Sequence, residues 1–241
     1  MSENNITRTI HKKLGVIINA AESGERLPSE PKLAEKMGVS RATLREAMRT
    51  FEIRGMLRRQ QGVGTFVIHP TQIFESGLEN LLSLETLAER IGLPISLGDV
   101  DVQTLEAVGD VSENLRLEPG EEVLQVSRVI LAEEHPVAFL VDTLPIGILA
   151  SEMLTDQFTG SVLDILIKRN DPPLASSRCE INAVAAPKKV AQALNIQSRD
   201  PLLRFVSLLY TEQGEAVDYS YSYFLPGYFH FHIVRRIGNG I

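Results

Sequence analysis

The chain has 241 residues, of which 44% are hydrophobic, and its formal net charge is -7. This length allows more than one folded domain, and the acidic charge argues against a protein that coats nucleic acid indiscriminately. The charge is divided unevenly: residues 1–70 contain 12 Lys and Arg against 7 Asp and Glu (+5), leaving 12 against 24 (-12) for the remainder. A basic N-terminal part on an acidic remainder favours DNA contact at one end of the chain.

Several classes of protein are disfavoured by what the sequence lacks. Cys179 is the only cysteine, which excludes an internal disulfide and a cysteine-based zinc site. We expect it to serve as a small apolar strand residue rather than a reactive thiol. No segment approaches the ~20 apolar residues of a membrane span, and no signal-peptide core is present, so we expect a cytoplasmic protein with no membrane partner. No fixed-period repeat or low-complexity tract is apparent.

The N-terminal part begins with the patterns of two helices. Apolar residues at helical spacing predict the first over residues 6–21. The second is predicted over residues 30–37, because Ser29 suits an N-cap and Pro31 suits the first helical turn. Gly38 follows where a left-handed C-terminal cap is expected.

A third helix is expected after a turn of only three residues, with Ser40 as its N-cap and its end near Arg54. Its basic side chains form one stripe at spacing i, i+4, i+8: Arg41, Arg45 and Arg49. Positive charge at a helix N-terminus opposes the helix dipole unless a phosphate or a base edge supplies the negative partner. The alternative is an ordinary solvated charged face.

Residues 57–67 predict a β-hairpin directly after this helix. Arg58 and Arg59 lead into a tip that contains Gly62 and Gly64, which suits a tight turn carrying positive charge toward a phosphate backbone. Two helices joined by a sharp turn and followed by a hairpin predict a winged helix-turn-helix, which enters a DNA groove.

The segments LPSE, LAEKMGVSRATLREAM and QQGVGTFV resemble the DNA-binding domain of the GntR family of bacterial transcription regulators. The resemblance and the basic stripe together indicate the following DNA-binding residues: Ser40, Arg41, Thr43, Arg45 and Arg49 on the third helix, and Gln61 and Gly62 on the hairpin. Many members have Arg where this chain has Pro31, so the contact made there is expected to pass to Lys32. A homodimer of such heads would bind an inverted repeat in double-stranded DNA.

The β pattern breaks after the hairpin, which predicts a linker over residues 70–76 between an N-terminal domain (1–69) and a C-terminal domain (77–241). The elements expected beyond it are a helix (78–91), a strand (100–108), a helix (111–115), a hairpin (123–145), a helix (161–168), a strand (177–185), a helix (187–194) and a second hairpin (202–225). This order predicts an α+β domain around a mostly antiparallel sheet.

The order of these elements, the strands containing VSR and DYSYSYF, and the helix GSVLDIL resemble the UTRA effector domain of HutC-type GntR regulators. The resemblance implies a small-molecule site between the sheet and the helix after the first hairpin. In it, Arg128 would meet an anionic group of the ligand and Ser161 would donate to the same group. The chemistry agrees, because a guanidinium and a helix N-terminus both bind anions. The alternatives are an Arg128 paired with an acid and a Ser161 that is a plain N-cap.

The remaining candidate effector residues are Asp218, Tyr219, Tyr221 and Arg178. Arg178 alternates with Glu180 on one strand and could instead form an exposed ion pair. This chain departs from the pattern of members that bind phosphosugars at four positions: Ile130, Leu140, Leu163 and Phe224. We therefore expect an effector other than a phosphosugar, such as a carboxylate or another organic metabolite.

The sequence thus predicts a transcriptional repressor with no cofactor, no metal and no catalytic residues. The alternative is an enzyme, because the UTRA fold resembles chorismate lyase and its cleft could turn over a small organic acid. No Ser/His/Asp arrangement, metal-ligand cluster or Gly-rich phosphate loop stands out. His230 and His232 could supply two ligands to a metal, although surface histidines are the commoner explanation. A nucleoid-type structural protein is disfavoured by the acidic remainder.

Overall fold

The computed structural model describes residues 3–22, 24–53, 56–60, 63–67, 74–118, 120–150, 153–154, 158 and 160–233. Its contacts divide the chain into two compact units, one formed by Met1–Ile73 with Leu225–Tyr228 and the other by Phe74–Phe224 with Phe229–Ile241. Within the described residues, no helix combines the length and the apolar character needed to cross a membrane.

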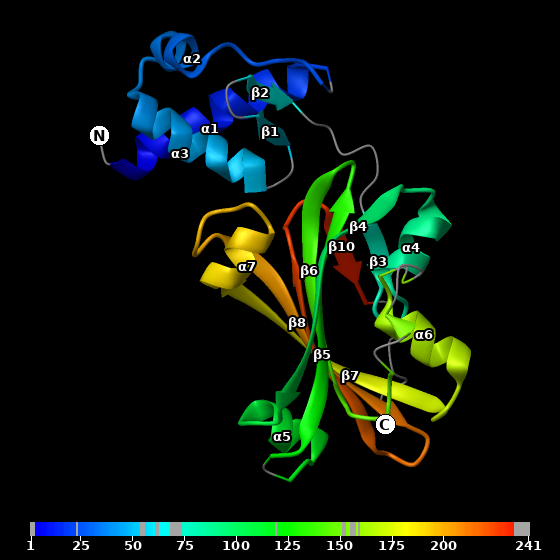
Figure 1. Ribbon diagram of the computed structural model, residues 1–241. Coiled ribbons are helices and arrows are strands. Elements are labelled where there is room, and N and C mark those ends of the chain that lie inside the picture. Colours follow the sequence, from blue (N-terminus) through cyan, green and yellow to red (C-terminus); the bar gives the residue numbers. More distant parts are fainter. Residues whose placement is uncertain are drawn as a thin grey trace, which may run out of the picture. The chain divides into compact units, whose positions relative to one another are not determined.

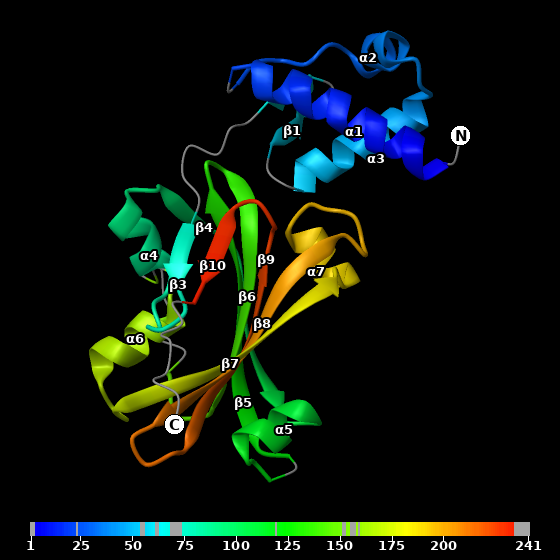
Figure 2. The same cartoon turned by 180° about the vertical axis from the view of Figure 1, so that it is seen from behind.

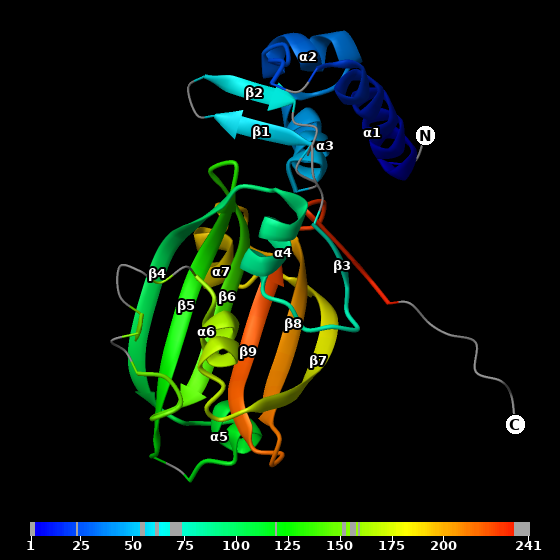
Figure 3. The ribbon, with the colours of Figure 1, turned by 90° about the vertical axis from the view of Figure 1, so that its right-hand side faces the viewer.

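The described part of the first unit contains three helices and a two-stranded antiparallel sheet (Figure 1). The elements are α1 (Glu3–Ala20), α2 (Glu30–Met37), α3 (Arg41–Ile53), β1 (Leu57–Gln60) and β2 (Gly64–Val67). One apolar face of each helix and the ends of the hairpin form the core, which includes Leu14, Ile18, Leu33, Leu44, Phe51, Leu57 and Val67. The predicted winged helix-turn-helix is confirmed, and Figure 3 shows its hairpin beside α3.

Two of the three predicted helix caps form. Gly38 adopts φ 68°, and backbone N–H groups at this cap donate to the last turn of α2. Ser40 Oγ accepts a hydrogen bond from the Thr43 N–H at 3.1 Å, which caps α3. The prediction for Ser29 is wrong in part, because it precedes α2 but its side chain makes no capping hydrogen bond. Pro31, in the first turn, lacks one of the N–H groups that such a cap would bind.

The second unit is built on a six-stranded antiparallel sheet with strand order β4-β5-β6-β9-β8-β7. The strands are β4 (Ile95–Glu106), β5 (Glu122–Ala132), β6 (His135–Pro145), β7 (Leu174–Ala185), β8 (Pro201–Thr211) and β9 (Ala216–Phe224). The helices are α4 (Leu84–Ile91), α5 (Asp110–Leu115), α6 (Val162–Arg169) and α7 (Lys188–Ala193). Figures 1 and 2 show α4 and α6 on one face of the sheet and α5 and α7 on the other. The predicted α+β fold is confirmed.

The sheet contains a duplicated unit that the sequence did not reveal. Its halves are β4-α5-β5-β6 and β7-α7-β8-β9, and the two halves meet at the central strands β6 and β9. The Ala107 N–H donates to the Glu121 carbonyl at 2.7 Å, and at the matching place the Ala186 N–H donates to the Asp200 carbonyl at 2.7 Å. The two halves therefore share their element order and this backbone hydrogen bond.

Two short strands outside this sheet were not predicted. β3 (Phe74–Gly77) and β10 (Phe229–His232) pair in parallel. Each has four residues, and their partners are distant in sequence, so no local pattern identifies them.

The helix predicted over residues 78–91 also begins later than expected. α4 starts at Leu84 because Ser83 is its N-cap, with Ser83 Oγ accepting from the Thr86 N–H at 2.9 Å.

Candidate DNA-binding surface and effector site

The N-terminal turn of α3 and the neighbouring side of α2 present the predicted DNA-binding residues. Arg41, Arg45 and Lys32 are exposed, and Thr43 is half-buried. The hydroxyls of Ser40 and Thr43 lie 2.7 Å apart, so the cap also fixes the threonine side chain. The exposed cations therefore lie where a helix N-terminus can add its N–H groups to the binding of phosphate.

Glu30 connects the third helix to the hairpin, a role that sequence reasoning missed. Its side chain is only 13% exposed, and its carboxylate accepts a hydrogen bond from Arg45 Nε at 2.7 Å. The other carboxylate oxygen pairs with Arg59 on β1. Arg45 keeps 54% of its side chain exposed, so the pair orients the guanidinium without enclosing it. The LPSE segment supplied the glutamate, but only the fold shows its two partners.

The other predicted DNA-binding residues differ in their availability. Arg49 is 25% exposed and lies 3.8 Å from Glu46, so it is less accessible than Arg41 or Arg45. Gln61 and Gly62 lie outside the described residues.

In the second unit, Arg128 on β5 is buried and paired with Asp142 on β6. Leu140, one of the positions that depart from the phosphosugar-binding pattern, lies directly opposite Arg128 in the sheet. Asp142, the acid that pairs with Arg128, lies two residues further along on the same face of the strand. The alternative considered for Arg128, an arginine paired with an acid, is therefore present in the structure, but the pair is buried rather than at the surface.

Ser161 caps α6, with its Oγ accepting from the Asp164 N–H at 2.9 Å. The Asp164 carboxylate in turn accepts hydrogen bonds from Ser83 Oγ at 2.6 Å and from Thr86 Oγ1 at 3.3 Å. The first turns of α4 and α6 are thus joined through one acid. Sequence reasoning missed Ser83, Thr86 and Asp164, whose proximity depends on helix packing.

Two further acids lie near Arg128, and their pKa values are raised. Burial raises the pKa of Asp218 well above its ordinary value, and the nearby Asp142 raises it further. Asp218 Oδ1 accepts from the Thr143 N–H at 3.1 Å. Burial also raises the pKa of Glu85, an effect that Arg128 partly offsets. We define the acid cluster as the four acids Glu85, Asp142, Asp164 and Asp218 together with Arg128.

The six predicted effector residues do not line one cleft. In the register of β6 and β9, Asp142 lies opposite Ser220, whereas Val141 lies opposite Tyr221 and Thr143 opposite Tyr219. Because side chains alternate between faces, Tyr219 and Tyr221 project from the face opposite to Asp142.

Arg178 lies on the edge strand β7, where it forms an exposed pair with Glu180 at 2.6 Å, the alternative considered from sequence. Its strand position places it on the same face as Tyr219. Only Arg128, Ser161 and Asp218 therefore belong to the side of the sheet that carries α6.

A separate hollow of about 630 Å³ lies beside α4 and is lined by Gly77, Glu79, Asn80, Leu81, Leu82, Leu87 and Arg90. None of the predicted effector residues lines it. In the part of the chain that the structure describes, no three His, Cys, Asp or Glu side chains are arranged to hold a metal, and His230 and His232 are exposed on β10.

The raised pKa of Asp218 predicts how stability depends on pH. An acid whose pKa is higher in the folded than in the unfolded state binds more protons when folded, so stability falls as pH rises from about 4 through the raised pKa. Asp218→Asn retains an oxygen to accept from Thr143 but removes this titration. Between pH 4.5 and 8, the free energy of unfolding of Asp218→Asn should fall less with rising pH than that of the wild type.

Urea unfolding followed by tyrosine fluorescence measures this difference, because the chain has no Trp and four of its five tyrosines lie on β8 and β9. Asp99→Asn, which changes an exposed acid, is the control and should match the wild type at every pH. Equal pH profiles for Asp218→Asn and wild type would contradict the assignment.

Comparison with known proteins identifies the family. Residues 15–67 match the model for bacterial regulatory proteins of the gntR family, and residues 98–230 match the UTRA domain. The chain belongs to the GntR family. With its UTRA domain it is of the HutC type, and it is a DNA-binding transcriptional regulator rather than an enzyme.

Its relatives and structural neighbours agree with this membership. The chain is 30% identical over 215 residues to the HTH-type transcriptional regulator Rv0792c of Mycobacterium tuberculosis, covering 86% of this chain and 76% of the relative. It is 29% identical over 196 residues to the HTH-type transcriptional repressor NagR of Bacillus subtilis, covering 81% and 79%. The crystal structure of PhnF from Mycobacterium smegmatis shares the fold, with a TM-score of 0.64, 22% identity, and coverage of 94% of this chain and 99% of that one.

Proposed function

We propose that this GntR regulator is a repressor that binds an inverted-repeat operator as a homodimer. The observation that carries the proposal is the exposed pair Arg41 and Arg45 at the capped N-terminus of α3. Two such DNA-binding domains related by a two-fold axis require two DNA half-sites that run in opposite directions. Residues 1–69 would bind DNA in the cytoplasm, and residues 77–241 would bind the effector and dimerise. Of residues 70–76, proposed as the link, Phe74–Ser76 belong to β3 of the second unit.

The acid cluster is the proposed effector site, with Arg128, Ser161 and Asp218 as the residues first indicated by the sequence. The two groups expected to bind a ligand anion already have acidic partners, since Arg128 pairs with Asp142 and the first turn of α6 holds Asp164. A phosphate would have to displace or approach these carboxylates, at a considerable electrostatic cost. This supports an effector that is not a phosphosugar.

Control by the effector requires that it bind the DNA-bound and DNA-free arrangements with different affinity.

Glu85 Oε1 is buried without a hydrogen-bond partner among the described residues, and the pKa of this acid is raised. A ligand that donates to Glu85 would therefore supply a missing interaction.

The function is tested by binding of the purified protein to DNA upstream of its own gene, with excess nonspecific competitor. We expect a discrete complex and a nuclease footprint over a short inverted repeat. Candidate metabolites added to the same assay should change the affinity if they are effectors. Lack of any selective complex, with or without cell extract as a source of ligand, would overturn the proposal.

A further inference from the structure

Glu85, in the first turn of α4, is the acid of the cluster whose capacity to accept hydrogen bonds is not fully used. Each of the other three acids has a hydrogen-bond partner in the second unit. Glu85 Oε1 is buried and has no hydrogen-bond partner among the described residues. An acceptor buried without a donor costs free energy, so a ligand that donates to Glu85 gains a strong interaction.

The Glu85 carboxylate lies beside the N-terminal end of α6. A Cβ atom added to Gly160 would lie 2.9 Å from Glu85 Oε1, and Gly160 directly precedes Ser161, the N-cap of α6. Asp164, in the first turn of the same helix, is a second carboxylate at this end. The partial positive charge of the helix end, which would otherwise attract a ligand anion, is thus offset by two acids of the protein itself.

The acid cluster has an excess of negative charge. Its four acids and one arginine have a formal charge of -3 when all are ionised. Burial raises the pKa of Glu85, Arg128 partly offsets this, and the nearby Asp164 and Asp142 raise the pKa further. A positively charged ligand would reduce the repulsion among these acids, whereas a negatively charged ligand would increase it.

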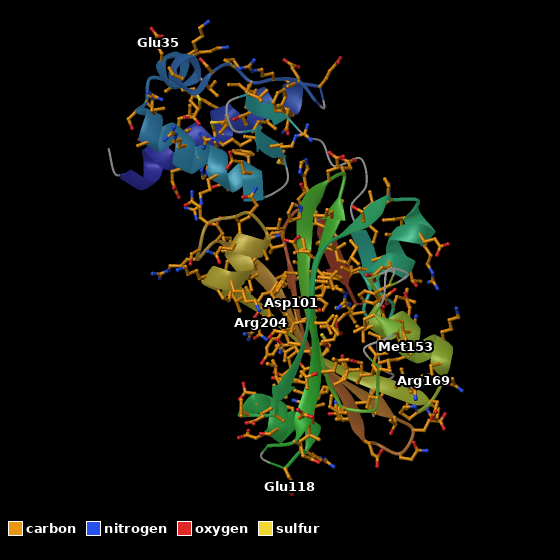
Figure 4. The ribbon with its side chains drawn as sticks, viewed as in Figure 1. Glu35, Asp101, Glu118, Met153, Arg169 and Arg204 are labelled. Carbon is orange, nitrogen blue, oxygen red and sulfur yellow. The ribbon has the colours of Figure 1, made fainter. Side chains whose placement is uncertain are left out.

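The other cations of α6 lie away from the cluster. Lys168 and Arg169 belong to the last turn of the helix, and residues 162 and 169 are separated by about 10 Å along its axis. Figure 4 shows Arg169 at that end of α6, where it donates to the Ile148 carbonyl at 2.8 Å. Within the cluster itself, the positive charge therefore comes from Arg128.

Arg128 has a donor that is not used. Its side chain is only 5% exposed, and it pairs with Asp142 through one terminal nitrogen. Arg128 Nε is buried and has no hydrogen-bond partner in the part of the chain that the structure describes. A hydroxyl or carbonyl oxygen can accept from Nε without adding negative charge to the cluster. The site therefore favours a ligand that combines a cationic donor for Glu85 with an uncharged acceptor for Arg128.

We propose that the effector is an organic cation, in which a protonated amine donates to Glu85 and a neighbouring hydroxyl or carbonyl oxygen accepts from Arg128. The inference rests on the proposed effector site and names the chemical class of its ligand. An ammonium group bound to a carboxylate forms a charge-assisted hydrogen bond, which is stronger than a neutral one. The carboxylate effector considered from the sequence is disfavoured, because it would bring a further negative charge beside Glu85 and Asp164. Glu85 is thus the residue that determines the charge specificity of the site.

Three small molecules that share a hydroxyl group but differ in charge test this specificity on the full-length protein. They are ethanolamine, which is protonated at neutral pH, neutral ethylene glycol and anionic glycolate. With KCl added to equalise the ionic strength, we expect ethanolamine to bind with a Kd of about 10 mM, so that about 100 mM raises the midpoint of thermal unfolding by about 3–6 °C. Ethylene glycol and glycolate should raise it by less than about 1 °C. Tyrosine fluorescence follows the second unit, because four of the five tyrosines lie on β8 and β9.

Two variants of α4 assign the binding to Glu85. Glu85→Gln keeps the size of the side chain but removes its charge, and should raise the Kd of ethanolamine at least about tenfold, because a hydrogen bond between charged groups is lost. Glu89→Gln removes the same charge from an exposed position of the same helix and should bind ethanolamine like the wild type. Midpoint shifts over a series of ethanolamine concentrations give each Kd.

Stabilisation by ethanolamine no greater than that by ethylene glycol or glycolate would overturn the proposal, and so would equal affinities of Glu85→Gln and wild type. Should Glu85→Gln fail to fold by circular dichroism, the comparison of the three small molecules on the wild type decides. The operator footprint needs no ethanolamine, so the two proposals fail separately. A footprint without ethanolamine binding leaves the regulator standing and removes this inference, whereas ethanolamine binding without a footprint retains the ligand class and removes the proposed repressor.

Discussion

Replacing Arg128 with methionine should lower the free energy of unfolding of the second unit by about 3–5 kcal/mol. Methionine retains much of the length of the side chain but leaves the Asp142 carboxylate buried without its partner, and breaking a buried ion pair from one side carries a penalty of this size. The effect should be large here because Asp218, whose pKa is raised by burial and further by Asp142, lies nearby. Urea unfolding followed by tyrosine fluorescence measures the change.

Two further variants distinguish a lost ion pair from lost packing. Arg128→Met combined with Asp142→Leu removes both charges and should recover most of the stability. Arg178→Met breaks the exposed pair with Glu180, whose side chains are 69% and 59% exposed, and should have an effect below about 1 kcal/mol. A loss in Arg128→Met no greater than that in Arg178→Met would show that the buried pair contributes little.

Replacing Arg45 with alanine should weaken operator binding by about 1–3 kcal/mol, which is roughly 5- to 150-fold, and relax the preference at one base position. The reason is that Arg45 is exposed at the start of α3 and is oriented by Glu30. A direct base contact should cost specific affinity more than nonspecific affinity. Fluorescence anisotropy with the operator and with scrambled DNA measures both.

Lys36→Ala also removes one positive charge, but in the last turn of α2, where the lysine is exposed. This variant controls for a general loss of positive charge. Lys36→Ala should weaken binding to the operator and to scrambled DNA slightly and equally. Equal losses on both DNAs for Arg45→Ala would mean that Arg45 contacts phosphate. Unchanged binding to both would contradict its place in the DNA-binding surface.

The sequence by itself determined the first unit almost completely, because its signals are local. A glycine at the left-handed cap after α2 and Ser40 before α3 mark the turn within a few residues. The apolar residues at helical spacing in the three helices then specify one core. The hairpins and short helices of the second unit were predicted for the same reason, since each forms from neighbouring residues.

Only the tertiary structure decided which residues share a site. A strand pattern shows that Asp218 and Tyr219 alternate, but the register of β6 and β9 was needed to place Asp218 with Arg128 and the tyrosines on the opposite face. Arg128 pairs with Asp142 and not with Leu140, the residue directly opposite, since a guanidinium can reach a diagonal neighbour across the strands.

The same limit explains the missed contacts between distant elements. Glu30 meets Arg45 and Arg59 only because α2, α3 and β1 pack together, and Asp164 meets Ser83 only because α4 and α6 do. The parallel pair β3 and β10 joins strands from the beginning and the end of the second unit's sequence. Secondary structure here follows from local spacing, caps and turns, whereas the sites depend on long-range packing and strand register, which no local pattern contains.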